Sequence, residues 1–192
     1  ELSNGDLYLT LILVGIVSLI VGMGLDATPA YITLATLLAP ALVQLGVPPM
    51  AAHLYVVYWG LASFFTPPTC IAVFVTCSIS GSKVWETGWE AVKLGIAAFL
   101  VPVAFVLEPA LLLNGSPARI ALATCTALIG AVALAAGIRG YALDVLNPLQ
   151  RIMMGIAGIL FILPGLLYPA IGAALALAAL AMGYARTRAA AR

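Results

Sequence analysis

Between Asp26 and Lys83 the chain carries no aspartate, glutamate, lysine or arginine. Over the whole sequence 64% of the residues are hydrophobic and 8% are charged, whereas soluble domains carry about 25% charged residues. So few charges cannot cover a water-exposed surface without leaving large apolar patches. Because lipid as a solvent removes this difficulty, we predict an integral, all-α membrane protein. No basic run favours a nucleic acid as partner; the partner that composition implies is the lipid bilayer.

The first apolar stretch is interrupted by GMGLDATPAYI, residues 22–32, which contains two glycines, a proline, two hydroxyl groups and a carboxylate. The apolar runs on either side, residues 8–23 and 31–45, are shorter than the roughly 20 residues that a spanning helix needs. Two short helices joined by such a tip predict a re-entrant hairpin over residues 7–45, which enters and leaves the membrane on one side. Two complete but tilted spans are the alternative.

A second interruption lies within residues 48–80, a segment longer than one membrane crossing. Pro67 and Pro68 stand near its middle, in the sequence TPPTC. They remove two backbone donors and disfavour helical geometry just before them. We therefore predict one crossing helix that is broken halfway. Carbonyl groups freed at that depth must be buried in protein or line a cavity.

The polar loop GSKVWETGWEAVK, residues 81–93, separates this segment from a helix predicted over residues 92–113. Glu90 and Lys93 are spaced to share a helix face. If this loop is cytoplasmic, alternation of the later helices predicts a cytoplasmic C-terminus, and only Arg119 lies outside. The remaining basic residues are then cytoplasmic, namely Lys83, Lys93, Arg139, Arg151, Arg186, Arg188 and Arg192. In this orientation the hairpin dips from the outer face, and its tip meets the proline break near the midplane.

Two interruptions that face each other in a membrane are the strongest functional signal in the sequence. Interrupted helices expose N–H groups at one end and carbonyl groups at the other, and these bind anions and cations respectively. The tip offers glycines for close approach and a hydroxyl, and the break offers three hydroxyls beside carbonyls freed by proline. These hard oxygens suit Na⁺ or another hard cation, with a small polar solute beside it. The candidate residues are Gly22, Gly24, Thr28, Ser63, Thr66, Pro67 and Thr69.

Asp26 is a functional candidate because carboxylates within membranes are costly. It could be a cation ligand, a proton carrier, or the N-cap of the second hairpin helix, and the sequence does not decide among these. His53 is predicted to be a packed or interfacial histidine. The cysteines Cys70, Cys77 and Cys125 are predicted to be small buried hydrophobes rather than metal ligands or disulfide partners.

An intramembrane aspartyl protease and a scaffold subunit are the two alternatives to a transporter. GMGLD is spaced G-x-G-x-D rather than the G-x-G-D of intramembrane aspartyl proteases, and that chemistry needs a second aspartate in the same site. The other aspartates are Asp6, near the start of the hairpin, and Asp144, in a cytoplasmic loop. We therefore predict no catalytic residue and no enzyme. A scaffold subunit without its own transport site is the alternative, but it would not need two facing interruptions.

The segment GMGLDATPAYITLATLLAPALVQLGVPPM, the TPP motif and the EPALLL ending together resemble the large membrane subunit of TRAP (tripartite ATP-independent periplasmic) transporters. The similarity is greatest to fused, TAXI-type permeases and covers roughly residues 7–115. It implies an elevator-type, Na⁺-driven secondary transporter of the ion-transporter superfamily in a bacterial or archaeal cytoplasmic (inner) membrane. It further implies that a periplasmic solute-binding protein delivers small organic acids, and that a small membrane subunit or its fused equivalent is a partner.

The resemblance also implies how the chain is organised. Residues 1–115 would be the second inverted repeat of the transport domain, and residues 116–192 would be additional C-terminal transmembrane helices. Since residue 1 is Glu, we expect an N-terminal half of the permease as a further partner. The site carried over from the family would use Gly22, Gly24, Asp26, Ser63, Thr66 and Pro67 for Na⁺, and Thr28, Ser63, Thr66 and Thr69 for substrate. No cofactor other than the coupling ion is implied.

The sequence departs from its TAXI-type relatives at both parts of this site. Their tip reads GLPTTAAY, whereas this chain reads GLDATPAY, so that Asp26 replaces a proline. Their break reads SNLTPP, whereas this chain reads ASFFTPP and places Phe64 where a polar side chain is usual. Both departures therefore bear on the identity of the cation and on its affinity.

Overall fold

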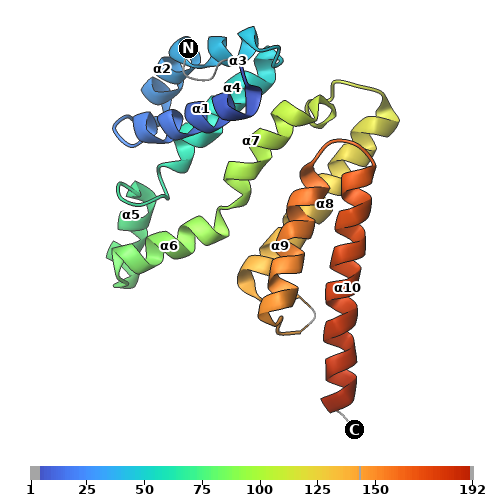
Figure 1. Cartoon of the computed structure of the whole chain (residues 1–192). Coiled ribbons are helices and arrows are strands. Elements are labelled where there is room, and N and C mark those ends of the chain that lie inside the picture. Colours follow the sequence, from blue (N-terminus) through green and yellow to red (C-terminus); the bar gives the residue numbers. More distant parts are fainter. Residues whose placement is uncertain (1–4, 143, 191–192) are drawn as a thin grey trace. The chain divides into compact units, whose positions relative to one another are not determined.

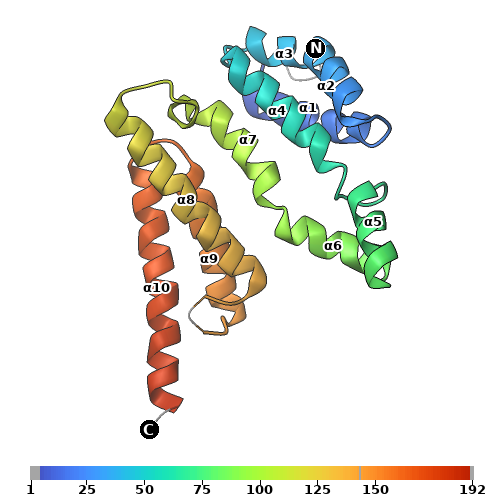
Figure 2. The ribbon, with the colours of Figure 1, turned by 180° about the vertical axis from the view of Figure 1, so that it is seen from behind.

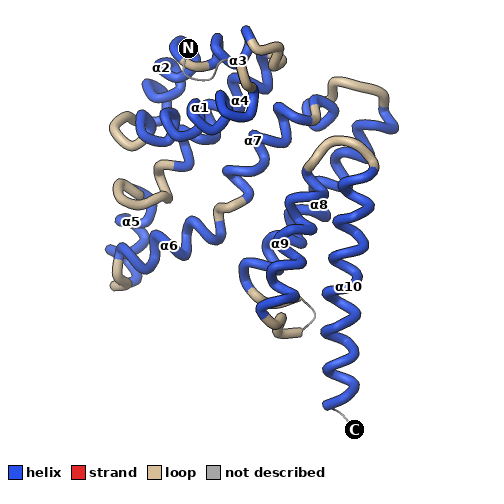
Figure 3. The backbone as a smooth tube through the Cα atoms, viewed as in Figure 1, coloured by secondary structure: helices blue, strands red, loops and turns tan. Residues whose placement is uncertain are grey.

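Helices form the regular secondary structure of the residues that the computed structural model describes, 5–142 and 144–190 (Figures 1 and 3). The predicted all-α class is therefore confirmed. The chain divides into two units, Glu1–Leu112 and Leu113–Arg192. Each unit is described by itself.

Unit 1 begins with four helices: α1 (Leu7–Gly22), α2 (Ala27–Leu37), α3 (Ala39–Gln44) and α4 (Pro49–Ala62). The second apolar run thus forms two helices rather than one, and the first of them starts four residues before the expected Tyr31. The early start has a local cause, because the Asp26 carboxylate accepts a hydrogen bond from the N–H of Ala27. Pro29 and Pro40 each lie in the first turn of a helix, where a missing N–H costs little.

Helix α4 is the centre of unit 1, and α1 packs along it in the same direction. The Tyr55 hydroxyl of α4 donates a 2.7 Å hydrogen bond to the Leu11 carbonyl of α1. Nearer the C-terminal ends of both helices, Gly22 lies against Gly60. The buried core around these contacts is aliphatic and includes Leu11, Val14, Leu34, Leu42, Val56 and Val106.

The expected interruption of residues 48–80 is present. Helix α4 ends at Ala62, and the next helix, α5 (Ile71–Ser80), begins after the proline pair, whose Pro67–Pro68 peptide bond is cis. The chain then forms α6 (Val84–Leu94), α7 (Ala97–Leu107) and a short 3₁₀ helix, η1 (Pro109–Leu112).

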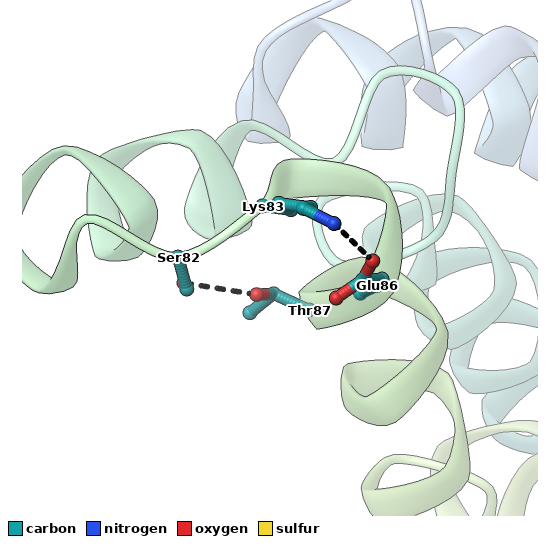
Figure 4. A network of polar contacts seen from close by, with 4 residues as sticks. All are labelled: Ser82, Lys83, Glu86 and Thr87. Atoms are coloured by element: carbon teal, nitrogen blue, oxygen red, sulfur yellow. Dashed lines mark hydrogen bonds and ion pairs between the residues drawn. The ribbon is translucent and has the colours of Figure 1, made fainter.

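Helix α6 carries the charges of the polar loop on its exposed surface. Figure 4 shows its start, where Lys83 forms a 3.0 Å ion pair with Glu86 and the Thr87 hydroxyl donates to Ser82. Near the other end Lys93 and Glu90 are 2.6 Å apart, so the shared helix face predicted for them is confirmed. Because these pairs are exposed, each contributes only about 0–1 kcal/mol to stability.

Unit 2 consists of α8 (Pro117–Arg139), α9 (Pro148–Ile162) and α10 (Leu167–Ala190), and α9 packs against both of the others (Figures 1 and 2). Glycines allow the close approach of α8 and α9: a Cβ on Gly158 would lie 2.8 Å from the Gly130 carbonyl oxygen. Asn147 and Gln150 form a reciprocal capping box at the start of α9. The buried Gln150 amide also donates a 2.8 Å hydrogen bond to the Ala179 carbonyl of α10.

Three helical stretches among the described residues are long and apolar enough to cross a membrane: Ala27–Gln44, Val84–Leu107 and Pro117–Arg139. Shorter apolar helices are Leu7–Gly22, Ile71–Ser80, Pro148–Ile162 and Leu167–Gly183. Large apolar side chains such as Ile79 and Leu128 are exposed on the protein surface, where lipid is their suitable solvent. The chain is therefore a multi-pass membrane protein, as predicted.

The three cysteines have free thiols, but they differ in burial. Cys70 and Cys77 are buried with Val73 beneath α6, as predicted. The prediction of burial is wrong for Cys125, which is exposed on α8. A small thiol is apolar enough to face lipid, so composition alone could not distinguish the interior of unit 2 from its lipid-facing surface.

Candidate functional site

The C-terminal ends of α1 and α4 meet at a pair of glycines. A Cβ on Gly22 would overlap the Gly60 carbonyl oxygen and would lie 2.9 Å from Ser63 Oγ. Glycine is therefore required at position 22 by the packing rather than by an unusual backbone angle. Because the C-terminal end of a helix carries partial negative charge on its carbonyls, two such ends in contact form a local environment that favours a cation.

The three hydroxyl groups of the break each donate a hydrogen bond to a main-chain carbonyl. Ser63 Oγ donates to the Gly60 carbonyl at 2.7 Å, and Thr66 Oγ1 donates to the Ala62 carbonyl at 2.7 Å. Thr69 Oγ1 makes a longer contact of 3.5 Å to the Ser63 carbonyl. A hydroxyl whose proton is used in this way keeps its oxygen lone pairs as acceptors, so these oxygens can coordinate a metal cation or accept a donor from a substrate.

Ser18 is a polar residue of this region that the sequence reasoning missed. Its side chain is fully buried, and its Oγ is one of two buried side-chain polar atoms, with Trp59 Nε1, that lack a hydrogen-bond partner among the described residues. Ser18 lies one turn before Gly22 on the face of α1 that packs against Gly60. A buried hydroxyl without a partner is costly. The only available sequence signal was its spacing of four residues from Gly22 in an otherwise apolar helix.

The other residues predicted at the tip lie on the exposed turn between α1 and α2. Gly24 is exposed, and a Cβ there would have only the Val21 carbonyl within 4.0 Å. Thr28 is exposed in the first turn of α2 rather than in a loop. The structure therefore brings Gly22 to the break, whereas Gly24 lies on the connecting turn and Thr28 in the first turn of α2.

Asp26 occupies the N-cap of α2. Its carboxylate oxygen accepts a 2.9 Å hydrogen bond from the Ala27 N–H, and the residue is exposed. Of the three roles left open for this carboxylate, the cap is the one with a contact in the structure. Negative charge at a helix N-terminus is also favourable. The carboxylate stands four residues after Gly22 in the sequence.

Helix α6 covers another side of the break through two further glycines. A Cβ on Gly88 would lie 2.8 Å from Pro67 Cγ, and one on Gly95 would lie 2.6 Å from the Phe65 ring. Phe65 in turn packs edge to face with Phe99 of α7. These contacts partly cover the apolar side of the break. The hydroxyls of Ser63, Thr66 and Thr69 are therefore the side-chain groups of the segment that can bind a polar ligand.

His53 behaves as the packed or interfacial histidine that was predicted. Its Nδ1 is 3.2 Å from the Tyr31 hydroxyl, and the two rings meet edge to face. Within the part of the chain that the structure describes, no three His, Cys, Asp or Glu side chains form a group able to hold a metal ion. The groups that the break itself offers to a cation are hydroxyl and carbonyl oxygens, which suit hard ions.

The comparisons with known proteins agree with this architecture. The model of the tripartite ATP-independent periplasmic transporter DctM component matches residues 1–116, which include both interruptions and all the candidate site residues. No curated protein and no solved structure matches the chain. The DctM family is a family of transporters and not of enzymes, and its membership implies a periplasmic binding protein and membrane partners. The chain belongs to the DctM family, the large permease component of TRAP transporters.

Proposed function

We propose that this chain forms part of a secondary, Na⁺-coupled TRAP permease that imports small organic acids delivered by a periplasmic solute-binding protein. Membership of the DctM family supports the permease function. The coupling ion is inferred from the site, and the observation that carries it is the contact between the C-terminal ends of α1 and α4 at Gly22 and Gly60. That contact concentrates carbonyl oxygens, and the adjacent Ser63 hydroxyl has its proton committed to Gly60.

The proposed cation site is centred on Ser63 and Thr66. Their oxygens, with carbonyls near Gly22 and Pro67, supply the neutral ligands that a monovalent hard cation accepts. Asp26 acts through its charge from the N-cap of α2, and Gly24 leaves the turn open beside it. We assign the substrate to the exposed side of the same region, where the Thr28 hydroxyl can donate a hydrogen bond to a carboxylate. Thr69 can do the same if its hydroxyl turns away from its long 3.5 Å contact with the Ser63 carbonyl.

The proposed setting is a bacterial or archaeal inner membrane with a cytoplasmic C-terminus. Arg139 and Arg151 flank the connection between α8 and α9, and Arg119 lies at the opposite end of α8. Basic residues are more frequent in cytoplasmic connections. This distribution supports the orientation, in which the turn after α1 approaches the break from the outer face as a re-entrant hairpin and moves with it in an elevator mechanism.

The ion site can be tested without knowing the substrate, by following the thermal unfolding of the purified chain in lipid nanodiscs. Replacing K⁺ by Na⁺ at constant ionic strength should stabilise the protein, by about 2.7 kcal/mol when Na⁺ is 100 times its dissociation constant. Ser63→Ala and Thr66→Val should each weaken this Na⁺ effect. Thr36→Val is the matched control, because the Thr36 hydroxyl also donates to carbonyls of its own helix but lies on the exposed surface of α2.

Asp26→Asn separates the two roles of the carboxylate. Asparagine is as good an N-cap as aspartate, so the variant should unfold like the original chain in K⁺. If the negative charge assists the cation, the Na⁺ effect alone should shrink. Stabilisation by Na⁺ that persists in the combined Asp26→Asn and Thr66→Val variant would exclude this site. A scaffold subunit without a transport site would show no difference between Na⁺ and K⁺.

A further inference from the structure

Unit 2 contains a groove of about 680 Å³ that the transport site does not use. Most of its lining comes from α8 and the connection that follows it, and the buried Met154 of α9 and Leu180 of α10 contribute one residue each. The lining residues are Val132, Ala135, Ala136, Arg139, Tyr141, Ala142, Met154 and Leu180. All of them except Arg139 and Tyr141 are apolar, and those two lie together at the end of α8. The groove therefore has an apolar length and one polar end.

The polar end of the groove has a positive balance of charge. Arg139 is the last residue of α8, and Arg151 lies near the start of α9. The one carboxylate in the connection between these helices is Asp144, whose oxygen accepts a hydrogen bond from the Val145 N–H. This end of unit 2 therefore attracts anions.

The two arginines that flank the connection, Arg139 and Arg151, have different surroundings. Arg151 donates to the carbonyls of Gly137 and Ile138, at 3.1 Å and 2.8 Å, and thereby covers the negative end of α8. An anion beside the end of α8 is consequently not repelled by uncovered carbonyls. Arg139 lines the groove itself and is exposed. Its guanidinium can bind phosphate oxygens in a bidentate manner.

We propose that this groove binds an anionic phospholipid, with one acyl chain between α8 and α10 and the phosphate at Arg139. Charge complementarity selects this occupant, because an apolar channel that ends at an arginine matches a molecule with a hydrocarbon chain and an anionic head. The end of a membrane-spanning helix such as α8 also lies at the level of lipid headgroups. Basic pockets between transmembrane helices bind anionic headgroups in the same way. The proposal concerns residues beyond the DctM match and does not depend on Na⁺ coupling.

Native mass spectrometry of the complete chain, incubated with equal amounts of phosphatidylglycerol and phosphatidylcholine of the same acyl composition, tests the proposal. The original chain should retain phosphatidylglycerol about fivefold more than phosphatidylcholine, the contribution of one basic side chain near anionic headgroups. Arg139→Gln should abolish this preference, whereas Arg139→Lys should keep most of it. Arg119→Gln is the matched control, because Arg119 lies at the other end of the same helix.

A second pair of variants tests the apolar part of the groove. Ala135→Phe should reduce retention of both lipids by filling the space for the acyl chain. Leu128→Phe, on another exposed part of α8, should leave retention unchanged. Equal retention of the two lipids by the original chain, or equal losses in Arg139→Gln and Arg119→Gln, would overturn the proposal. So would a second copy of the chain that occupies the groove and is displaced by Ala135→Phe.

Discussion

Replacing Gly22 by alanine is the sharpest test of the contact on which the proposed ion site depends. Alanine is normally preferred to glycine in a helix, by about 0.5–1 kcal/mol. At position 22 the added methyl group would instead overlap the Gly60 carbonyl oxygen and lie 2.8 Å from the Gly60 carbonyl carbon. Because both atoms belong to the backbone of α4, no side-chain rotation can relieve the contact, and the two helices must separate.

The size of the effect follows from this geometry. Overpacking of a filled interior costs about 1–3 kcal/mol, and a clash with backbone belongs in the upper part of that range. We expect Gly22→Ala to lower the free energy of unfolding by about 2–3 kcal/mol, measured by titration from mild detergent into sodium dodecyl sulfate with circular dichroism as the signal. The stabilisation by Na⁺ should fall as well, because the separation moves the carbonyls of α1 away from Ser63.

Gly24→Ala is the matched control, two residues along the same chain. A Cβ at position 24 would have a single neighbour within 4 Å, the Val21 carbonyl oxygen at 4.0 Å. Replacing glycine by alanine at such a site stabilises the folded protein by about 0.4–1 kcal/mol, because it lowers the conformational entropy of the unfolded chain. The two substitutions should therefore have opposite signs. A Gly22→Ala variant as stable as Gly24→Ala would refute the close approach of α1 and α4.

Two further substitutions test packing in each unit by the same unfolding titration. Tyr55→Phe removes the buried hydrogen bond to the Leu11 carbonyl and should cost about 0.5–1.5 kcal/mol; an unchanged free energy would contradict that bond. Gly158→Ala places a methyl group 2.8 Å from backbone atoms of α8 and should cost about 1–3 kcal/mol. Gly155→Ala, on the same helix with nothing within 4 Å of the added Cβ, should be neutral or stabilising, and equal losses for the two would be the contrary result.

The positions of the two interruptions could be predicted because their causes are local. Pro67 and Pro68 break a helix wherever they occur, and the observed break runs from Ala62 to Ile71. The start of α2 was misplaced because an apolar run marks the part of a helix that contacts lipid or protein, whereas the first turn is decided by capping. Asp26, Thr28 and Pro29 look like loop residues in composition but begin a helix.

The membership of the candidate site was only partly predictable. Ser63 and Thr66 are predicted site residues because hydroxyls next to a proline break are conspicuous, and Gly22 because glycines allow close approach; the structure places Gly22 against Gly60 and Ser63. Ser18 was missed, since a single serine within an apolar helix gives no sign of whether it faces lipid or the interior. Burial is a property of the packed helices, and Ser18 is buried because α1 lies directly against α4.

The sequence by itself determined that this chain is an integral membrane protein, that its apolar segments are interrupted twice, and that it resembles a TRAP permease. These properties depend on composition and on the covalent chemistry of glycine and proline, which do not change with the partners of a segment. Only the tertiary structure decided that Gly22 meets Gly60 and that Arg139 lies at one end of an apolar groove. Each of these depends on residues far apart in the chain, and only packing brings such residues together.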